Sequence, residues 1–183
     1  FGIIKKFRLN ELLSDICACL ENPRVRVHAV KTLKSFRENA NQELRRFYML
    51  FSGNQIVASS ILRIFGYNCS SENIDFLFSL LWSRTRTTRE AALSSISSCN
   101  YRMTPRDREK LNWLITDVIG VITWNISAGV TISRMDSGKQ ADAIDQENTR
   151  WIDFLFTLLS VSYGKESVNE FRRNLESDTV ESY

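Results

Sequence analysis

Apolar residues recur every three or four positions along most of this chain, and that spacing predicts α-helices. The first apolar stripe covers 9–20 and the second covers 24–38, with Asn22-Pro23 as the break between them. A third stripe covers 44–51 and a fourth covers 56–65. Ser52-Gly53-Asn54 ends the third stripe, and Gly66-Tyr67-Asn68 ends the fourth. The N-terminal half is therefore expected to consist of short helices joined by tight turns.

The second half continues the pattern with longer elements. Helices are expected over 71–81 and 88–99, then over 104–132 and 141–163, with a loop at 135–138. Ser70 or Ser71 suits the N-cap of the first of these, and Thr104-Pro105 suits the N-cap and first turn of the third. Gly164 is expected to break the chain before a short last helix over 168–175. No alternating pattern typical of strands is found, so the sequence predicts an all-α fold.

Composition supports a folded helical domain and excludes few functions. The 183 residues are 43% hydrophobic and 25% charged, an ordinary globular balance, and they include only 7 Gly and 2 Pro. The net charge of +3 is too small to require a nucleic-acid partner. Cys17 and Cys19 lie two positions apart on a predicted helix, so they point to different faces. We interpret these two, Cys69 and Cys99 as reduced thiols in a cytosolic compartment, most of them in the core.

Two segments repeat each other. The segment from Arg26 to Leu33 and the segment from Arg89 to Ile96 both read Arg, two variable residues, Ala, an apolar residue, two variable residues and an apolar residue. The Arg is expected to reach polar groups of the preceding turn, and the small Ala lets its helix approach a neighbour closely. A third, weaker match places 175–181 in register with 20–26, as the start of a truncated repeat or as a frayed polar tail.

The Asn22-Pro23-Arg24-Val25-Arg26 turn resembles the loop of HEAT repeats, with Asn in place of the usual Asp. The turn before Arg89 lacks both Pro and Val, so the second unit is degenerate. The resemblance implies a HEAT-like (armadillo-like) α-solenoid, a right-handed superhelical stack of antiparallel helix pairs, with two long helices in its C-terminal half. It also implies protein binding and no catalytic residues. We expect a boundary segment at 1–8, one repeat domain over 9–176, and the tail or truncated repeat at 177–183.

Two segments raise the question of a membrane. Phe1-Gly2-Ile3-Ile4 precedes Lys5, Lys6 and Arg8, as at the cytoplasmic exit of a membrane span or at an arbitrary cut before the first helix. The first alternative places the chain on the cytoplasmic side of a membrane-anchored protein, held through sequence before Phe1. The apolar segment over 111–132 contains Asp117, two Asn and several hydroxyl residues, so we expect a buried core helix there.

Candidate chemistry is sparse. His28 is the single histidine, and a surface or inter-helix position is expected for it. Asp136, Asp142, Asp145 and Glu147 suit a loop and the solvated first turns of a helix, without calcium-ligand spacing. No Gly-rich phosphate loop is found. We therefore predict no enzyme activity, no catalytic residue, no cofactor and no metal.

A basic cluster is the one candidate contact surface for an anion or a partner. It comprises Arg84, Arg86, Arg89, Arg102, Arg106, Arg108 and Lys110. Adjacent turns of a solenoid could bring these residues to one edge for phosphates, or they could line a solvated edge paired with local carboxylates. Trp82, Trp113, Trp124 and Trp151 are expected in the core, and an exposed one would mark a binding hot spot.

The function expected from these observations is a protein-interaction scaffold with an unknown protein partner. The alternative is a nucleic-acid-binding HEAT-like module that uses the basic cluster, although nucleic acid is the weaker expectation.

Overall fold

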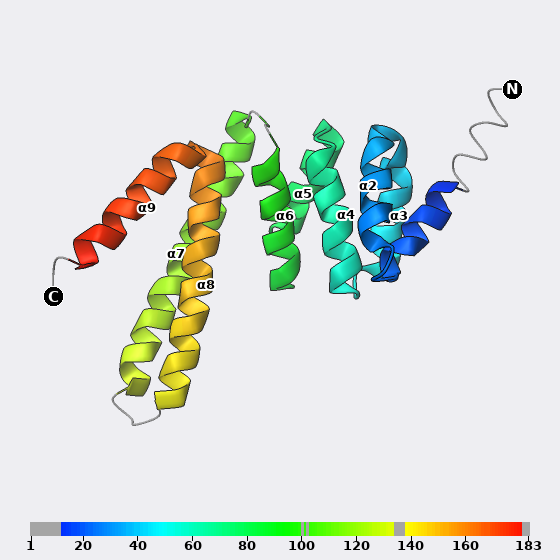
Figure 1. Cartoon of the computed structure of the whole chain (residues 1–183). Helices are drawn as coiled ribbons and strands as arrows, with labels where there is room; N and C mark the ends of the chain where they lie inside the picture. The colour runs from blue at the N-terminus through cyan, green and yellow to red at the C-terminus, as the bar shows by residue number, and fades with distance from the viewer. Residues whose placement is uncertain (1–11, 100, 102, 134–137, 181–183) are drawn as a thin grey trace, which may run out of the picture. The chain divides into compact units, whose positions relative to one another are not determined.

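The fold is known from a computed structural model, which describes residues 12–99, 101, 103–133 and 138–180. The described residues form helices and turns without a strand, which confirms the all-α prediction. They group into two compact units, Phe1–Tyr101 and Arg102–Tyr183 (Figure 1). The predicted single domain over 9–176 stays a prediction, and each unit is described by itself.

Unit 1 consists of short helices that follow the apolar stripes. Residues 12–18 are helical and lead into the 3-10 turn η1 (Cys19–Glu21). The following elements are α2 (Arg26–Ser35), η2 (Arg37–Ala40), α3 (Asn41–Phe51), α4 (Gln55–Tyr67), α5 (Ser71–Leu80) and α6 (Arg86–Ser98). Asn54 and Ser70 cap α4 and α5, since each side chain accepts a hydrogen bond from the backbone N–H three residues later. The Ser70 alternative for the N-cap is thus the one observed.

The helices of unit 1 lie in two rows. In one row α4 contacts both α2 and α6. The other row contains α3 and α5. Between them, the Tyr48 and Phe76 rings pack edge to face, with their centroids 5.3 Å apart. The core between the rows is aliphatic and aromatic, and Leu33, Leu62 and Phe65 have no exposed surface. This burial explains why the stripes in the sequence have helical period, since an amphipathic helix buries one apolar side. The central helix α4 contacts α2, α3, α5 and α6 and is buried around most of its circumference.

Glycine at position 66 lies inside α4 and does not end the helix as predicted; α4 continues to Tyr67. A Cβ at this position would lie 2.7 Å from both the Cβ and the carbonyl oxygen of Ser95 on α6. Because one of these atoms belongs to the backbone, α6 would have to move to make room. Gly66 is therefore required by the close approach of α4 to α6.

The substitution Gly66→Ala is expected to lower the free energy of unfolding by about 2 kcal/mol, as about 3 kcal/mol of overpacking exceeds the roughly 1 kcal/mol that Ala contributes in a helix. Gly120→Ala is the matched control: nothing lies within 4 Å of a Cβ at that helical position, so Ala is expected to stabilise. Urea denaturation followed by circular dichroism measures both changes. Equal shifts for the two variants would contradict the close approach.

Unit 2 is a long antiparallel hairpin followed by a third helix. The hairpin pairs α7 (Pro105–Ser133) with α8 (Gly138–Tyr163), and α9 (Lys165–Val180) packs on α8 (Figure 1). Thr104 caps α7 as predicted: the Asp107 N–H donates to the Thr104 hydroxyl oxygen, and the Thr104 N–H donates to the Asp107 carboxylate. Gly164, with φ of +98°, breaks the chain between α8 and α9, also as predicted.

The last helix is longer than predicted. Residues 175–180 continue α9, where the weaker match placed a repeat turn, and residues 181–183 of the predicted tail lie outside the described residues. The physical reason is the absence of a Pro or Gly after Gly164, which leaves nothing in the sequence to stop the helix. The predicted loop at 135–138 falls on residues outside the described part of the chain, apart from Gly138, which begins α8.

Candidate functional site

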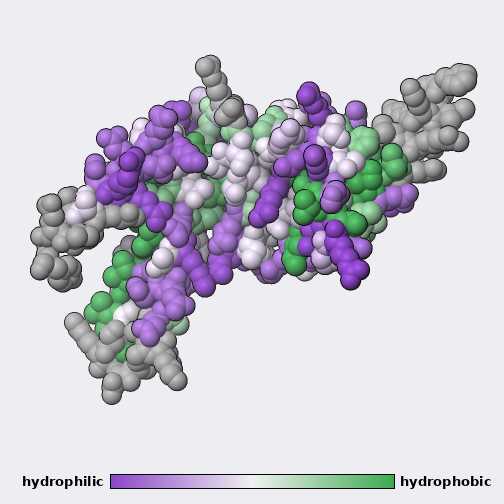
Figure 2. Space-filling model, in the orientation of Figure 1, coloured by the Kyte–Doolittle hydropathy of each residue, from purple (hydrophilic) through white to green (hydrophobic). Residues whose placement is uncertain are grey.

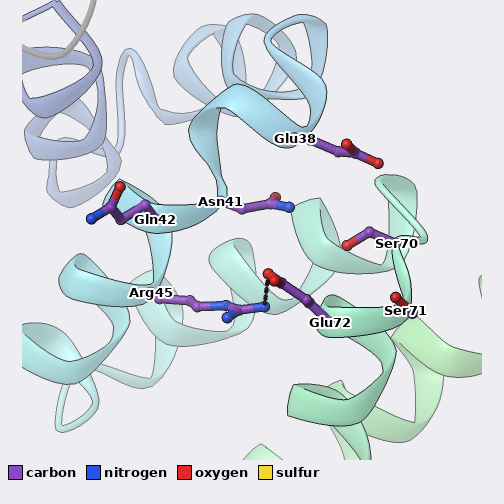
Figure 3. A pocket seen from close by; sticks show the side chains of 7 residues that line it. All are labelled: Glu38, Asn41, Gln42, Arg45, Ser70, Ser71 and Glu72. Atoms are coloured by element: carbon purple, nitrogen blue, oxygen red, sulfur yellow. Dashed lines mark ion pairs between the residues drawn. The ribbon is translucent and has the colours of Figure 1, made fainter.

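A polar cavity of about 580 Å³ lies in unit 1 where the start of α3 meets the start of α5 (Figure 3). One wall comes from η2 and α3, and the other comes from the N-terminal turn of α5. Every lining residue is polar or charged: Glu38, Asn41, Gln42, Arg45, Ser70, Ser71 and Glu72. The Arg45 guanidinium lies 3.2 Å from the Glu72 carboxylate across the cavity. The side chain of Glu72 is 73% exposed, so this ion pair adds little to stability.

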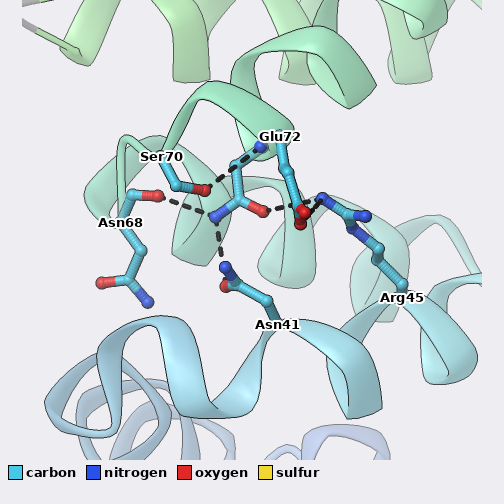
Figure 4. Close-up of polar contacts among 6 residues, drawn as sticks. Asn41, Arg45, Asn68, Ser70 and Glu72 are labelled. Carbon is cyan, nitrogen blue, oxygen red and sulfur yellow. Dashed lines mark hydrogen bonds and ion pairs between the residues drawn. The ribbon is translucent and has the colours of Figure 1, made fainter.

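A hydrogen-bond network centred on Asn73 lies beside the cavity, and Figure 4 shows its partners Asn41, Arg45 and Asn68. Its side-chain amide donates to the Asn41 carboxamide oxygen at 3.1 Å and to the Asn68 carbonyl oxygen at 2.7 Å. Its own carboxamide oxygen accepts from Arg45 at 3.4 Å. Asn73 has no exposed surface, and its bonds to Asn41 and Asn68 are buried, whereas the bond from Arg45 is partly buried. The network fixes α5 against α3 and holds the cavity walls in place.

The cavity offers hydrogen-bond donors and acceptors from carboxylates, amides, hydroxyls and one guanidinium group. Among the described residues, no three His, Cys, Asp or Glu side chains lie close enough together to hold a metal ion. His28 is exposed on α2, as predicted, and Asp142 and Asp145 are exposed on the first turns of α8. Asp136 lies outside the described residues.

The predicted basic cluster is divided between the two units. In unit 1, Arg86 pairs with Glu90 at 3.4 Å, and Arg89 donates to the Ser83 carbonyl oxygen at 2.8 Å. Arg84 is exposed in the turn before them. Arg106, Arg108 and Lys110 lie on the first turns of α7 in unit 2, and Arg102 is outside the described residues. A shared anion-binding edge therefore stays a prediction.

The cysteines correct the prediction of four reduced thiols. Cys69, after α4, and Cys99, after α6, form a disulfide bond with their Cα atoms 5.9 Å apart. Spacing in the sequence could not reveal this pair, because 30 residues separate the two cysteines and the fold alone brings them together. Cys17 is buried and Cys19 is exposed, as expected from their opposite directions. Burial, and to a smaller extent the Glu43 carboxylate, raises the pKa of Cys17 to about 12, so its thiol stays protonated and unreactive at neutral pH.

The long helix α7 is not the buried core helix that its sequence predicted. Only its α8-facing side is buried, through residues such as Leu111, Leu114 and Val118. Trp113 and Trp124 are each 71% exposed, and Trp82 is 49% exposed, which contradicts the expected core positions for three of the four tryptophans. Between Pro105 and Ile132, α7 is long and apolar enough to cross a membrane, and 11% of its most apolar window is buried.

An apolar surface, here called the α7 face, runs along the side of α7 away from α8. Figure 2 shows apolar surface along the outer side of the hairpin. The large side chains of the α7 face are Trp113, Ile119, Trp124, Ile126 and Val130. The hydroxyls among them are satisfied within the helix: Thr116, Thr123, Ser127 and Thr131 each donate to the carbonyl oxygen four residues earlier. A partner could therefore cover this face without leaving those hydroxyls unpaired.

The sequence of α8 contains a signal that one face of α7 is left uncovered. The apolar residues of α7 occur on all sides of the helix, which suits a helix covered all round. The segment 141–150 that packs beside the C-terminal half of α7 is mostly polar, and Ile144 is the residue that approaches Gly129. One amphipathic helix can cover only one side of its neighbour. The mismatch between an apolar α7 and a polar α8 thus indicates an uncovered face.

No family model, curated protein or solved structure matches this chain.

Proposed function

We propose that this chain is a non-catalytic scaffold that binds a protein partner, and that the α7 face is its binding surface. The observation that carries the proposal is the pair of indoles on that face, each 71% exposed. Exposed tryptophans beside aliphatic residues form the kind of surface in which binding energy concentrates at protein interfaces. The satisfied hydroxyls of Thr116 and Thr123 support the same reading, because they lower the cost of removing the face from water.

A HEAT-like arrangement of unit 1 forms part of the proposal. The two matching arginines make the same contact: Arg26 Nε donates to the Leu20 carbonyl oxygen at 2.7 Å, and Arg89 donates to that of Ser83 at 2.8 Å. In each case the acceptor lies six residues before the arginine. This agrees with the predicted reach of the Arg into the preceding turn, and it supports treating α2 and α6 as equivalent helices of stacked repeats.

The middle helix of the row supports the repeat as well. In α4, Ala58 is buried and Leu62 has no exposed surface, with the same spacing as Ala29 and Leu33 in α2. The pair in α6 is Ala92 and Ile96. Gln55 stands in α4 where the other two helices have Arg, which is why the sequence pattern did not reveal this unit. Three buried small residues at matching places suit helices that stack closely in one row.

Placement on the cytoplasmic side of a membrane stays a prediction. Its evidence lies in residues 1–8, which are outside the described residues. Disulfides such as Cys69–Cys99 are rare in the cytosol and common in oxidising compartments. The disulfide therefore favours an oxidising compartment over the cytosol for unit 1.

The double substitution Trp113→Ser/Trp124→Ser is expected to abolish partner binding and preserve the fold, because both indoles are exposed. Proteins retained by the immobilised wild-type chain are compared with those retained by the double variant and by Trp82→Ser, a control that removes an exposed indole from unit 1. A partner that depends on the α7 face is then purified and titrated, with at least a 100-fold loss of affinity expected for the double variant. Identical retention by all three proteins would refute the proposal.

A further inference from the structure

We infer that the partner of the α7 face is a second copy of this chain, held by an antiparallel pairing of two α7 helices centred on Gly120. The inference rests on the proposed function, since it names the occupant of the same surface.

The shape of the α7 face suits another α-helix. Small residues at helical spacing form its midline: Thr116, Gly120, Thr123 and Ser127. Nothing lies within 4 Å of a Cβ placed on Gly120, so the midline is open there. The two indoles flank the midline on one side, and Ile119, Ile126 and Val130 flank it on the other. A shallow groove between two apolar ridges is thereby available to a helix of a second molecule.

The order of large and small residues along α7 is complementary to itself when one copy is reversed. Trp113 precedes Gly120 by seven residues, and Ser127 follows it by seven. Likewise, Trp124 follows Gly120 by four residues, and Thr116 precedes it by four. In an antiparallel pair centred on Gly120, each indole therefore lies level with a small residue of the second copy.

The exposed area meets the lower limit for a specific dimer. The two indoles and three aliphatic side chains expose on the order of 500 Å² on each copy, and a pair would bury about 1,000 Å² of this apolar surface. An interface of this size lies at the low end of specific complexes, where weak and reversible pairs are found.

A lipid bilayer fits the same surface less well. Gly129 of α7 approaches Ile144 of α8, so the C-terminal half of α7 cannot enter a membrane without the first half of α8. That half of α8 contains Asp142, Asp145, Glu147 and Arg150, which are costly to bury in hydrocarbon. A protein surface of matching shape avoids this cost.

The test combines sedimentation analysis with cysteine cross-linking of the full chain in a Cys19→Ser background, which removes the exposed free thiol. The wild-type chain is expected to change from monomer to dimer between about 1 and 200 µM, and Trp113→Ser/Trp124→Ser is expected to weaken the dimer at least 100-fold. Trp82→Ser should dimerise as the wild type does. Circular dichroism of each variant verifies that its helices are retained.

Cross-linking distinguishes the direction of the pair. Gly120→Cys should form a disulfide-linked dimer under mild oxidation, because position 120 faces itself. Thr116→Cys should not, as its two copies would lie eight residues apart along the helices, about 12 Å. Efficient cross-linking through Thr116→Cys would indicate a parallel pair and overturn the stated geometry.

Two outcomes would overturn the inference in different ways. A monomer at 200 µM that binds a different protein through Trp113 and Trp124 would remove the second copy and leave the proposed function intact. A monomer that instead floats with phosphatidylcholine vesicles, and loses this property in the double Trp variant, would identify a lipid surface and refute both proposals.

Discussion

Asn73→Ala is expected to lower the free energy of unfolding by about 3 kcal/mol, one of the two largest single effects foreseen for this chain. The Asn73 side chain joins Asn41, Arg45 and the Asn68 carbonyl group at a place with no exposed surface. The Asn68 oxygen retains a hydrogen bond from the Ser70 N–H, whereas the Asn41 carboxamide oxygen loses the partner that the network provides. The cost therefore comes mainly from the buried Asn41 amide and from the volume left empty. Urea denaturation monitored by circular dichroism measures it.

A double-mutant cycle separates the network from simple loss of volume. In Asn41→Ala/Asn73→Ala the Asn41 oxygen is no longer stranded, so the combined loss should be smaller than the sum of the two single losses. Asn169→Ala, at an exposed position of α9, is the control and should change the free energy of unfolding by less than about 0.5 kcal/mol. Strict additivity of the two substitutions would show that Asn41 and Asn73 do not act together.

The helices of unit 1 could be predicted because their determinants are local. Asn54 and Ser70 cap the helices that follow them, and the apolar stripe of each helix matches its buried side. The exact role of Gly66 could not be predicted, because it depends on Ser95, which is 29 positions away in the sequence. A glycine near the end of a helical stripe usually marks the end of the helix. The close approach of α4 to α6 shows why glycine is needed at position 66, since a Cβ there would meet Ser95.

The candidate sites were harder to predict than the helices, because they depend on contacts between residues far apart in the sequence. The cavity walls come from α3 and α5, so no contiguous motif encodes it. For α7, hydrophobic spacing was consistent with a fully covered helix, and the prediction failed because α8 covers one side alone. The exposed positions of Trp113 and Trp124 follow from the composition of a different helix. Local pattern therefore specified the elements, whereas the surfaces available for binding depended on which helices become neighbours.

Loss of the Cys69–Cys99 bond is expected to cost about 3.5 kcal/mol of unfolding free energy, because the bond closes a loop of 30 residues in the unfolded chain. The variant Cys69→Ser/Cys99→Ser and the wild-type chain treated with a reducing phosphine should lose the same amount. The double variant itself should not respond to the reductant. Thermal or urea denaturation with and without the reductant measures these differences.

Thiol labelling determines whether the bond forms in the first place. Unfolded but unreduced protein should expose the thiols of Cys17 and Cys19 alone, whereas reduction before labelling should add Cys69 and Cys99. Cys19→Ser is the control, since it removes an exposed thiol and should leave both the stability and its response to reductant unchanged. Four reactive thiols before reduction would contradict the bond.

The reduced fold should nevertheless persist, because both sulfurs lie within 3.0 Å of the Gly66 carbonyl oxygen, to which a thiol can donate. The crosslink would then add stability to a junction of α4 and α6 that is already fixed by the packing of Gly66 against Ser95.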